Sequence, residues 1–199
     1  MYSFEHCAKN FDYINEGSCR QVYGINDEWV IKKAYTNGGF WQNKNEIELY
    51  KQYKDTILPL CPIDLERSTE SDIFMARAEA IADMYEKEQK LWDSFDTILM
   101  KYIENCGETY STEEAKKKFI SELPKRTDKR LRNFIKKLTK FDSKFISTVF
   151  YDVCSFNCGL LDGEIVVLDY GYPDEDSEVP LPDNFYHVTK EYDDWFNEN

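Results

Sequence analysis

Short runs of alternating apolar and polar residues fill the first third of the chain, and this period of two is typical of antiparallel strands. The runs predict strands and hairpins over residues 13–14, 21–25 and 28–32, with two further strands over residues 57–65 and 71–78. Asn26-Asp27 supplies a tight turn between the second and third of these runs. A helix is predicted over residues 40–54, because Glu46, Tyr50 and Tyr53 recur at helical spacing.

From about residue 79 the pattern changes to the period of a helix. Helices are predicted over residues 82–104, 112–123 and 127–140, and residues 145–150 are predicted to be strand-like. Asp162-Gly163 lies between the apolar runs 160–161 and 165–168, which is a strong hairpin signal. We therefore expect an α+β protein with a β-rich part over residues 1–78 and a mainly helical part over residues 79–199.

Composition narrows the class of protein. The 199 residues are 42% hydrophobic and 16% aromatic, so the chain has enough apolar surface to fold and is not a disordered protein. No stretch approaches the roughly 18 consecutive apolar residues of a membrane span. The first residues also lack the basic-then-apolar shape of a signal peptide. We expect a cytoplasmic protein with no membrane partner.

Charge is spread unevenly along the chain. The formal net charge is −13, which makes general nucleic-acid binding unlikely because phosphates repel it. Residues 116–144 nevertheless carry 12 basic and 3 acidic side chains, and residues 172–199 carry 9 acidic and 1 basic. The basic segment is either a solvated helix face or a surface for an acidic partner. The acidic tail is either a solvated end fastened by its aromatic residues or an arm for a basic partner.

The six cysteines do not form a metal-binding pattern. No two of them have the two-residue spacing of a zinc knuckle, and both histidines lie far from the closest pair, Cys154 and Cys158. In a cytosolic chain they are most simply free and mostly buried thiols.

Val30-Ile31-Lys32 places a lysine inside an apolar strand. A buried ammonium group needs an anion. This anion is interpreted as a phosphate, with a carboxylate of the following helix holding the lysine in place. Glu46 and Glu48 are both candidates, and Glu46 is preferred because Tyr50, one turn later, fits a core position. The alternative is a lysine at the strand edge that points to water.

Three further motifs carry candidate chemistry. The turn Glu16-Gly17-Ser18 between two strands can offer backbone N–H groups and a hydroxyl to phosphates, although most such turns are ordinary hairpins. Asp152 and Asn157 share one loop, and Asp169 ends the apolar run 165–168. Carboxylate and amide oxygens suit Mg²⁺ better than Zn²⁺, whereas each residue taken alone is also an ordinary loop residue.

These motifs occur in the order of the protein-kinase signature set. They are the hairpin glycine, the strand lysine, the helix glutamate, Asp-x4-Asn and Asp-aromatic-Gly. The sequence resembles the protein-kinase-like superfamily over about residues 13–171, and most of all its small, divergent bacterial and bacteriophage-encoded members. The resemblance implies a two-lobed fold. A small antiparallel sheet and one helix would form the N-terminal lobe, and a reduced, mainly helical C-terminal lobe would follow.

The resemblance also implies roles for the residues of the first lobe. Gly17, with Ser18 beside it, matches the middle glycine of the glycine-rich loop, and Val22 the valine that follows the loop. Lys32 matches the lysine that binds the nucleotide phosphates, and Glu46 its helix partner. Met75 precedes the hinge, so that Ala76, Arg77 and Ala78 would offer backbone groups to adenine.

In the second lobe the resemblance implies that Asp152 orients the acceptor hydroxyl and that Asn157 and Asp169 bind Mg²⁺. The sequence departs from the family pattern at three places. Asn15 and Arg20 replace the outer glycines of the loop, and Phe150-Tyr151 replaces the His-Arg pair before Asp152. Only 28 residues follow Gly171, without the Ala-Pro-Glu motif.

Three functions follow from these observations. The first is an ATP- and Mg²⁺-dependent phosphotransferase that acts on Ser or Thr hydroxyls of a protein substrate. The second is a weakly active or inactive interaction protein on a kinase scaffold, which regulates a host protein through its acidic tail or basic helix. The third is a small-molecule kinase related to aminoglycoside or choline phosphotransferases. It is permitted because the sequence after Gly171 lacks the helical platform on which protein kinases usually bind a peptide.

Overall fold

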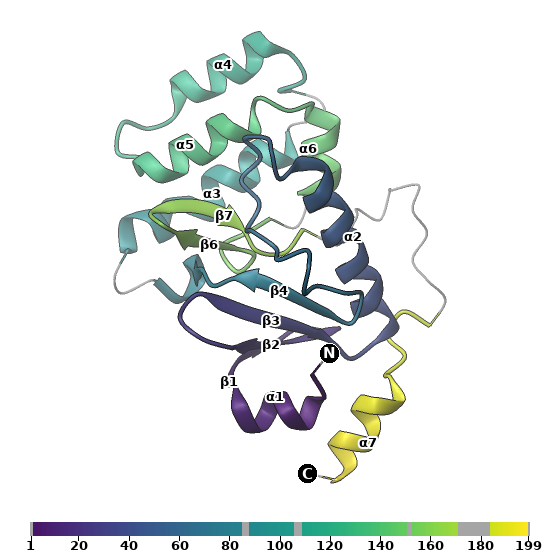
Figure 1. The fold of residues 1–199 in the computed structure, drawn as a ribbon. Helices are drawn as coiled ribbons and strands as arrows, with labels where there is room; N and C mark the ends of the chain where they lie inside the picture. Colours follow the sequence, from purple (N-terminus) through teal and green to yellow (C-terminus); the bar gives the residue numbers. More distant parts are fainter. Residues whose placement is uncertain (1, 85–87, 106–108, 151–152, 171–183, 199) are drawn as a thin grey trace. The chain divides into compact units, whose positions relative to one another are not determined.

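The structure of the chain, a computed structural model, describes residues 2–84, 88–105, 109–150, 153–170 and 184–198. These residues form two compact units, each with its own sheet and helices (Figure 1). The first unit comprises residues 1–52, 62–77 and 179–199, and the second comprises residues 53–61 and 78–178. The predicted α+β class is confirmed. The division differs from the predicted boundary at residue 78, because the C-terminal residues join the first unit and residues 53–61 join the second.

The first unit contains a four-stranded antiparallel sheet. Its strands, in spatial order, are β1 (Asp12–Glu16), β2 (Arg20–Gly24), β3 (Trp29–Ala34) and β4 (Asp72–Ala76). The backbone N–H groups of Ile25 and Asn26 both donate to the carbonyl of Trp29, which closes the predicted turn between β2 and β3. β3 is therefore an inner strand, hydrogen-bonded on both edges, and its lysines do not lie at a strand edge.

The two faces of this sheet carry different side chains, because successive residues of a strand point to opposite sides. One face carries Arg20 and Lys32, which contact helix α2 (Asn37–Tyr53). The other face is covered by helix α1 (Phe4–Asn10). The apolar core on that second face comprises Cys7, Tyr23, Ile31 and Phe74.

Helices α1 and α7 (Lys190–Glu198) were not expected from the sequence. The Ser3 hydroxyl caps α1 by accepting from the N–H of His6 at 3.1 Å. The two helices meet through aromatic rings, since Phe4 contacts both Tyr192 and Trp195. Aromatic residues thus fasten the C-terminal segment to the first unit, as the first interpretation of the tail predicted. The acidic run 174–178 lies outside the described residues.

The second unit is mainly helical. Its helices are the short 3-10 helix η1 (Ile81–Met84), α3 (Gln89–Glu104), α4 (Glu113–Glu122), α5 (Lys129–Leu138) and α6 (Ser143–Val149). A three-stranded antiparallel sheet, in the order β5 (Glu79–Ala80), β6 (Cys158–Leu161) and β7 (Glu164–Val167), completes it. Leu91, Phe95 and Leu99 of α3 and Leu131, Phe134 and Leu138 of α5 are buried, and this apolar surface forms the core of the unit.

The predicted hairpin at Asp162-Gly163 is confirmed. Both residues have positive φ, 51° for Asp162 and 78° for Gly163. A two-residue turn with positive φ at both positions matches the twist of the strands on either side, and Asp-Gly is a favoured sequence for it. The helix predicted over residues 112–123 is present as α4, and the Thr112 side chain caps its start by accepting from the N–H of Ala115.

Two local predictions are wrong. Residues 145–150, predicted as strand-like, belong largely to α6, because the Asp142 carboxylate accepts from the N–H groups of Lys144 and Phe145 and begins a helix there. Residues 57–65 form only isolated bridges at Leu60 and Ile63. Pro59 and Pro62 have no N–H to donate to a continuous ladder.

The described part of the chain contains no helix that is both long and apolar enough to cross a bilayer. Five of the six cysteines lie in that part, and all five are free thiols. Four of them are buried, as predicted. Burial raises the pKa of Cys7 to about 11, so this thiol stays protonated at neutral pH.

Candidate functional site

The first half of the candidate site is a buried ion pair between β3 and α2. The Lys32 Nζ lies 3.1 Å from both carboxylate oxygens of Glu46. The two residues are 6% and 0% exposed. Glu48, the other candidate, lies on the exposed side of α2 and pairs with Lys51. The structure thus brings Lys32 to Glu46, as the sequence predicted.

A second cation shares the same carboxylate. The Arg20 Nη1 lies 2.9 Å from Glu46 Oε1 and 3.1 Å from Asn43 Oδ1, and Arg20 is 5% exposed. The Glu46 carboxylate therefore pairs with an ammonium group from β3 and a guanidinium group from β2. Asn43 lies one helical turn before Glu46. Sequence reasoning did not identify Asn43. The available signal was its spacing of three residues from Glu46 on a helix face.

The turn between β1 and β2 holds the predicted phosphate-binding residues. Gly17 and Ser18 are exposed at its tip, and the N–H of Gly17 donates to the carbonyl of Arg20 at 2.9 Å. A Cβ atom added at Gly17 would meet only that carbonyl, at 4.0 Å. Val22 pairs with Lys32 in the register between β2 and β3. The turn, Val22 and Lys32 therefore belong to one part of the same sheet.

The predicted hinge follows β4. Met75 is buried and pairs with Val30 of β3. The N–H groups of Ala76 and Arg77 already donate to the carbonyls of Pro62 and Glu28, at 2.8 and 2.7 Å. The Arg77 guanidinium donates to the carbonyl of Asn26, which ties this residue to the turn between β2 and β3. These two N–H groups are used within the first unit. Ala78 begins the longer segment of the second unit.

The second unit carries the remaining predicted residues. The N–H of Leu168 donates to the carbonyl of Asn157 at 2.7 Å, so that Asn157 and Asp169 lie on adjoining stretches of backbone. Both side chains are half-buried. Tyr170 is buried and donates its hydroxyl to the carbonyl of Cys61 at 3.0 Å, which fixes the chain just after Asp169. Asp152 and Gly171 lie outside the described residues.

The loop that carries Asn157 is anchored by a residue that sequence reasoning missed. The Asp96 carboxylate of α3 accepts from the N–H of Ser155 at 2.7 Å and from its hydroxyl at 2.8 Å. The carbonyl of Ser155 accepts from the N–H of Ala82. Ser155 is 2% exposed, so these charge-assisted bonds form away from water. An acidic residue beside the buried Phe95 in an amphipathic helix was the available signal.

The chemistry of these donors decides which metal they suit. Asn157 and Asp169 offer an amide and a carboxylate oxygen, which fit a hard cation such as Mg²⁺. Within the described ranges, no group of three or more His, Cys, Asp or Glu side chains is arranged to bind a metal. Burial raises the pKa of the Cys158 thiol, which opposes the thiolate that zinc requires. The residues present therefore fit a magnesium ion better than zinc.

Comparisons with known proteins complete the description of the site. No protein-family model matches the chain, and no curated protein matches it. Among solved structures, the gentamicin complex of APH(2'')-IIa shares 15% identity and a TM-score of 0.45 over 86% of this chain and 69% of that chain. The streptomycin–ATP complex of the same protein gives 15% and 0.42 over 84% and 69%. The ADP-bound aminoglycoside phosphotransferase APH(2'')-Ib gives 14% and 0.43 over 84% and 69%. At these values the likeness carries neither a family nor an activity over to this chain.

Proposed function

We propose that the protein is an ATP- and Mg²⁺-dependent phosphotransferase. The observation that carries this proposal is the Lys32–Glu46 pair, an ammonium group on an inner strand held by a buried carboxylate. A lysine fixed in this way presents a positive charge in a defined place, which phosphoryl transfer requires. The adjoining Asn157 and Asp169 supply the oxygen donors in the second unit. The proposal requires that Lys32 and the two oxygen donors, Asn157 and Asp169, act on one nucleotide.

Each residue of the candidate site has a separate role in the proposed reaction. Lys32 neutralises charge on the nucleotide phosphates, and Gly17 and Ser18 offer backbone and hydroxyl groups to them. Asn157 and Asp169 would hold Mg²⁺, which when bound neutralises phosphate charge. Asp152 orients the acceptor hydroxyl and takes its proton. The bond between the terminal phosphorus and the bridging oxygen breaks to leave ADP, and a bond from the acceptor oxygen to that phosphorus forms.

A protein hydroxyl of Ser or Thr is the acceptor we favour. Phe156, inside the loop between Asp152 and Asn157, is 74% exposed. Single exposed aromatic rings are common on protein surfaces, but one inside this loop would lie beside the acceptor and could contact apolar side chains of a polypeptide.

Nucleotide binding is tested by thermal unfolding with ATP, with and without Mg²⁺. A ligand at about 100 times its Kd stabilises the native state by about 2.7 kcal/mol, which raises the Tm of a chain of this size by about 5–10 °C. We expect a Mg²⁺-dependent rise that Asp169→Ala abolishes. The matched control is Lys44→Ala, because Lys44 is 60% exposed on α2 and pairs only loosely, at 3.9 Å, with Glu70. A wild-type protein with no ATP-dependent rise contradicts the proposal.

The acceptor is tested by transfer of labelled phosphate from ATP. Autophosphorylation and a cell lysate test a protein acceptor, and a panel of aminoglycosides and choline tests small molecules. Label that appears on protein with the wild-type enzyme, but not with the Asp152→Ala variant, supports the proposal. Label found only in a small molecule corrects the acceptor and keeps the reaction. A biological activity that survives Lys32→Ala and Asp169→Ala, but not deletion of residues 172–199, identifies a non-enzymatic interaction protein instead.

A further inference from the structure

The C-terminal segment returns to the first unit and pairs with the connection between β3 and α2. The N–H of Gly38 donates to the carbonyl of Phe185 at 2.7 Å, and the N–H of Thr189 donates to the carbonyl of Tyr35 at 2.9 Å. Thr36 and Val188 form an antiparallel bridge between these contacts. A side chain at position 38 would collide with the Phe185 ring, whose nearest atom lies 2.5 Å from an added Cβ. Close backbone contact therefore fixes the start of α7.

Tyr192 of α7 lies in an aromatic cluster with the sheet. Its ring stacks on Tyr35 with a centroid distance of 4.6 Å and meets the edge of Phe4 at 5.1 Å. Trp195 stacks on Phe4 at 5.7 Å. Glu191, next to Tyr192, lies 3.8 Å from the buried Lys33 ammonium. Aromatic pairs of this kind are worth about 0.5–1.5 kcal/mol each beyond their burial, so several together hold α7 in place.

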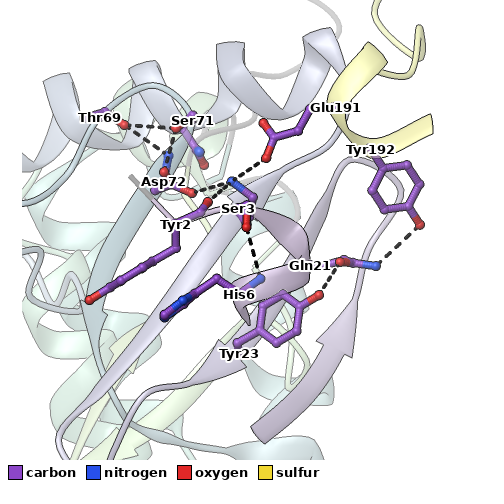
Figure 2. Close-up of polar contacts among 12 residues, drawn as sticks. Tyr2, Ser3, His6, Gln21, Tyr23, Thr69, Ser71, Asp72, Glu191 and Tyr192 are labelled. Atoms are coloured by element: carbon purple, nitrogen blue, oxygen red, sulfur yellow. Dashed lines mark hydrogen bonds and ion pairs between the residues drawn. The ribbon is translucent and has the colours of Figure 1, made fainter. Parts of the chain in front are cut away.

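From Tyr192 a set of hydrogen bonds reaches the turn between β1 and β2. Figure 2 shows the Tyr192 hydroxyl directed toward the Gln21 amide, whose Nε2 donates to it at 3.4 Å. The same amide donates to Glu16 Oε2 at 2.8 Å, and the Gln21 oxygen accepts from the Tyr23 hydroxyl at 2.6 Å. The Tyr35 hydroxyl, under the Tyr192 ring, donates to the carbonyl of Gly17 at 2.7 Å. The first route ends at Glu16, beside Gly17, and the second ends at Gly17 itself, so both reach the turn that is proposed to bind phosphate.

Strand β1 and the turn that follows it are exposed from residue 12 to residue 18, so burial contributes little to the order of the turn. Its own closing bond is the Gly17–Arg20 backbone contact. The pKa of Tyr35 and of Tyr192 is raised by burial and then by the nearby Glu16 carboxylate. Both phenols therefore stay protonated through the neutral range, and the bond from Tyr35 to Gly17 persists there.

We propose that α7 orders the Glu16-Gly17-Ser18 turn through Tyr192 and Tyr35, and that these two tyrosines are positioning residues for nucleotide binding. The part that concerns the nucleotide rests on the proposed function. The ordering of the turn does not, because it is a property of the first unit alone. Loss of the contact releases the turn, and a released turn binds the phosphates more weakly.

The first measurement is hydrogen exchange of the free protein at Gly17 and Tyr35. The N–H of Gly17 donates to Arg20 and that of Tyr35 donates to Cys19, so both report on the turn. Tyr192→Ala should speed exchange there by about three- to tenfold, because, of its aromatic contacts, the stack on Tyr35 is the one that reaches the turn. Lys190→Ala is the matched control, since it removes a side chain of the same helix that is 90% exposed and pairs with Asp194 at 3.8 Å. Tyr35→Phe keeps the stack and removes one hydrogen bond, so it tests the link in a protein that remains folded.

The second measurement is ATP affinity of the same variants. Tyr192→Ala should raise the KM for ATP by about three- to tenfold, in step with the loosened turn, while kcat changes by less than about twofold. Unchanged exchange in both Tyr192→Ala and Tyr35→Phe overturns the proposal, whatever the activity. Faster exchange with unchanged ATP affinity overturns the link to the nucleotide. If wild-type protein binds no ATP, the proposed function fails, and the exchange measurement still decides whether α7 orders the turn.

Discussion

Lys32 and Lys33 are neighbours in β3, yet their ammonium groups lie on opposite faces of the sheet and meet different partners. Lys32 contacts Glu46, which it shares with Arg20. Lys33 lies 3.2 Å from Asp72, 2.6 Å from the carbonyl of Tyr2 and 4.5 Å from the centre of the Phe4 ring. The side chain of Lys33 is 1% exposed and that of Lys32 is 8% exposed.

The comparison teaches that a buried lysine is not by itself a sign of function. The partners of Lys33 belong to β4 and to both ends of the chain, so this lysine joins the terminal segments to the sheet. The partners of Lys32 are side chains of the residues that flank the proposed site. The same residue type in adjacent positions therefore joins the terminal segments to the sheet on one face, and on the other face is the lysine that we propose to bind phosphate.

The largest effect should come from removing the carboxylate that two cations share. Glu46→Ala leaves Lys32 and Arg20 buried without this anion, and breaking a buried pair costs about 3–5 kcal/mol. We expect urea unfolding to show a loss at or above the middle of that range. Glu48→Ala on the same helix is the control, because Glu48 is exposed and bound only to Lys51. A loss below about 1 kcal/mol would show that the pair does not stabilise the unit.

The next effect separates the two lysines. Lys33→Met leaves Asp72 with the Ser71 hydroxyl at 2.7 Å and should cost about 3 kcal/mol, but it should leave the ATP-dependent rise in Tm intact. Lys32→Met should cost about 1–2 kcal/mol, because Arg20 still pairs with Glu46, and it should abolish that rise. Thermal unfolding with and without MgATP measures both quantities. The comparison fails if the ATP response is lost equally in the two variants.

A smaller effect should appear in the second unit at acid pH. Arg130 donates to Glu88 at 2.7 Å and to Asp128 at 3.0 Å, and these bonds lower the pKa of both carboxyl groups. Their stabilising contribution is fully present above the ordinary pKa values of 4.5 and 3.8 and is lost as the pH falls through the lowered values. Arg130→Met should therefore destabilise the protein at neutral pH and flatten the fall of stability between about pH 5 and pH 2. Urea unfolding across this pH range measures the free energy of unfolding of both proteins. A loss of the same size at every pH would contradict the assignment.

The smallest effect should come from an exposed pair. Lys51 and Glu48 lie 3.0 Å apart on α2 with side chains 51% and 64% exposed. Water screens such pairs, so Lys51→Ala should change the free energy of unfolding by less than about 0.5 kcal/mol. A larger loss would mean that distance, rather than burial, sets the strength of the ion pairs in this chain.

The sequence predicted those features that a short stretch of chain determines by itself. The β2–β3 turn, the Asp162-Gly163 hairpin and the choice of Glu46 over Glu48 all followed from local period and turn chemistry. The strand prediction for residues 145–150 was wrong because it followed the run of apolar residues. The helix α6 is instead begun by a single residue before that run, Asp142, whose carboxylate caps it.

Long-range contacts could not be predicted in the same way. The burial of Lys33 depends on Tyr2 and Asp72, which lie 31 and 39 residues away in the chain. The anchoring of the Asn157 loop depends on Asp96, 59 residues before Ser155. A period or spacing rule reads only a few residues at a time, so neither the Lys33 cluster nor the Asp96–Ser155 contact was accessible to it. The roles of the candidate site residues stay predictions.

The discontinuous first unit has a consequence for biosynthesis. A growing polypeptide leaves the ribosome at about 5–20 residues per second, and domains generally fold as they emerge. Here the edge that Tyr35 and Gly38 offer is completed only by Phe185 and Thr189, which are translated some 150 residues later. Residues 35–38 must therefore wait, incompletely covered, until residues 185–189 have been made.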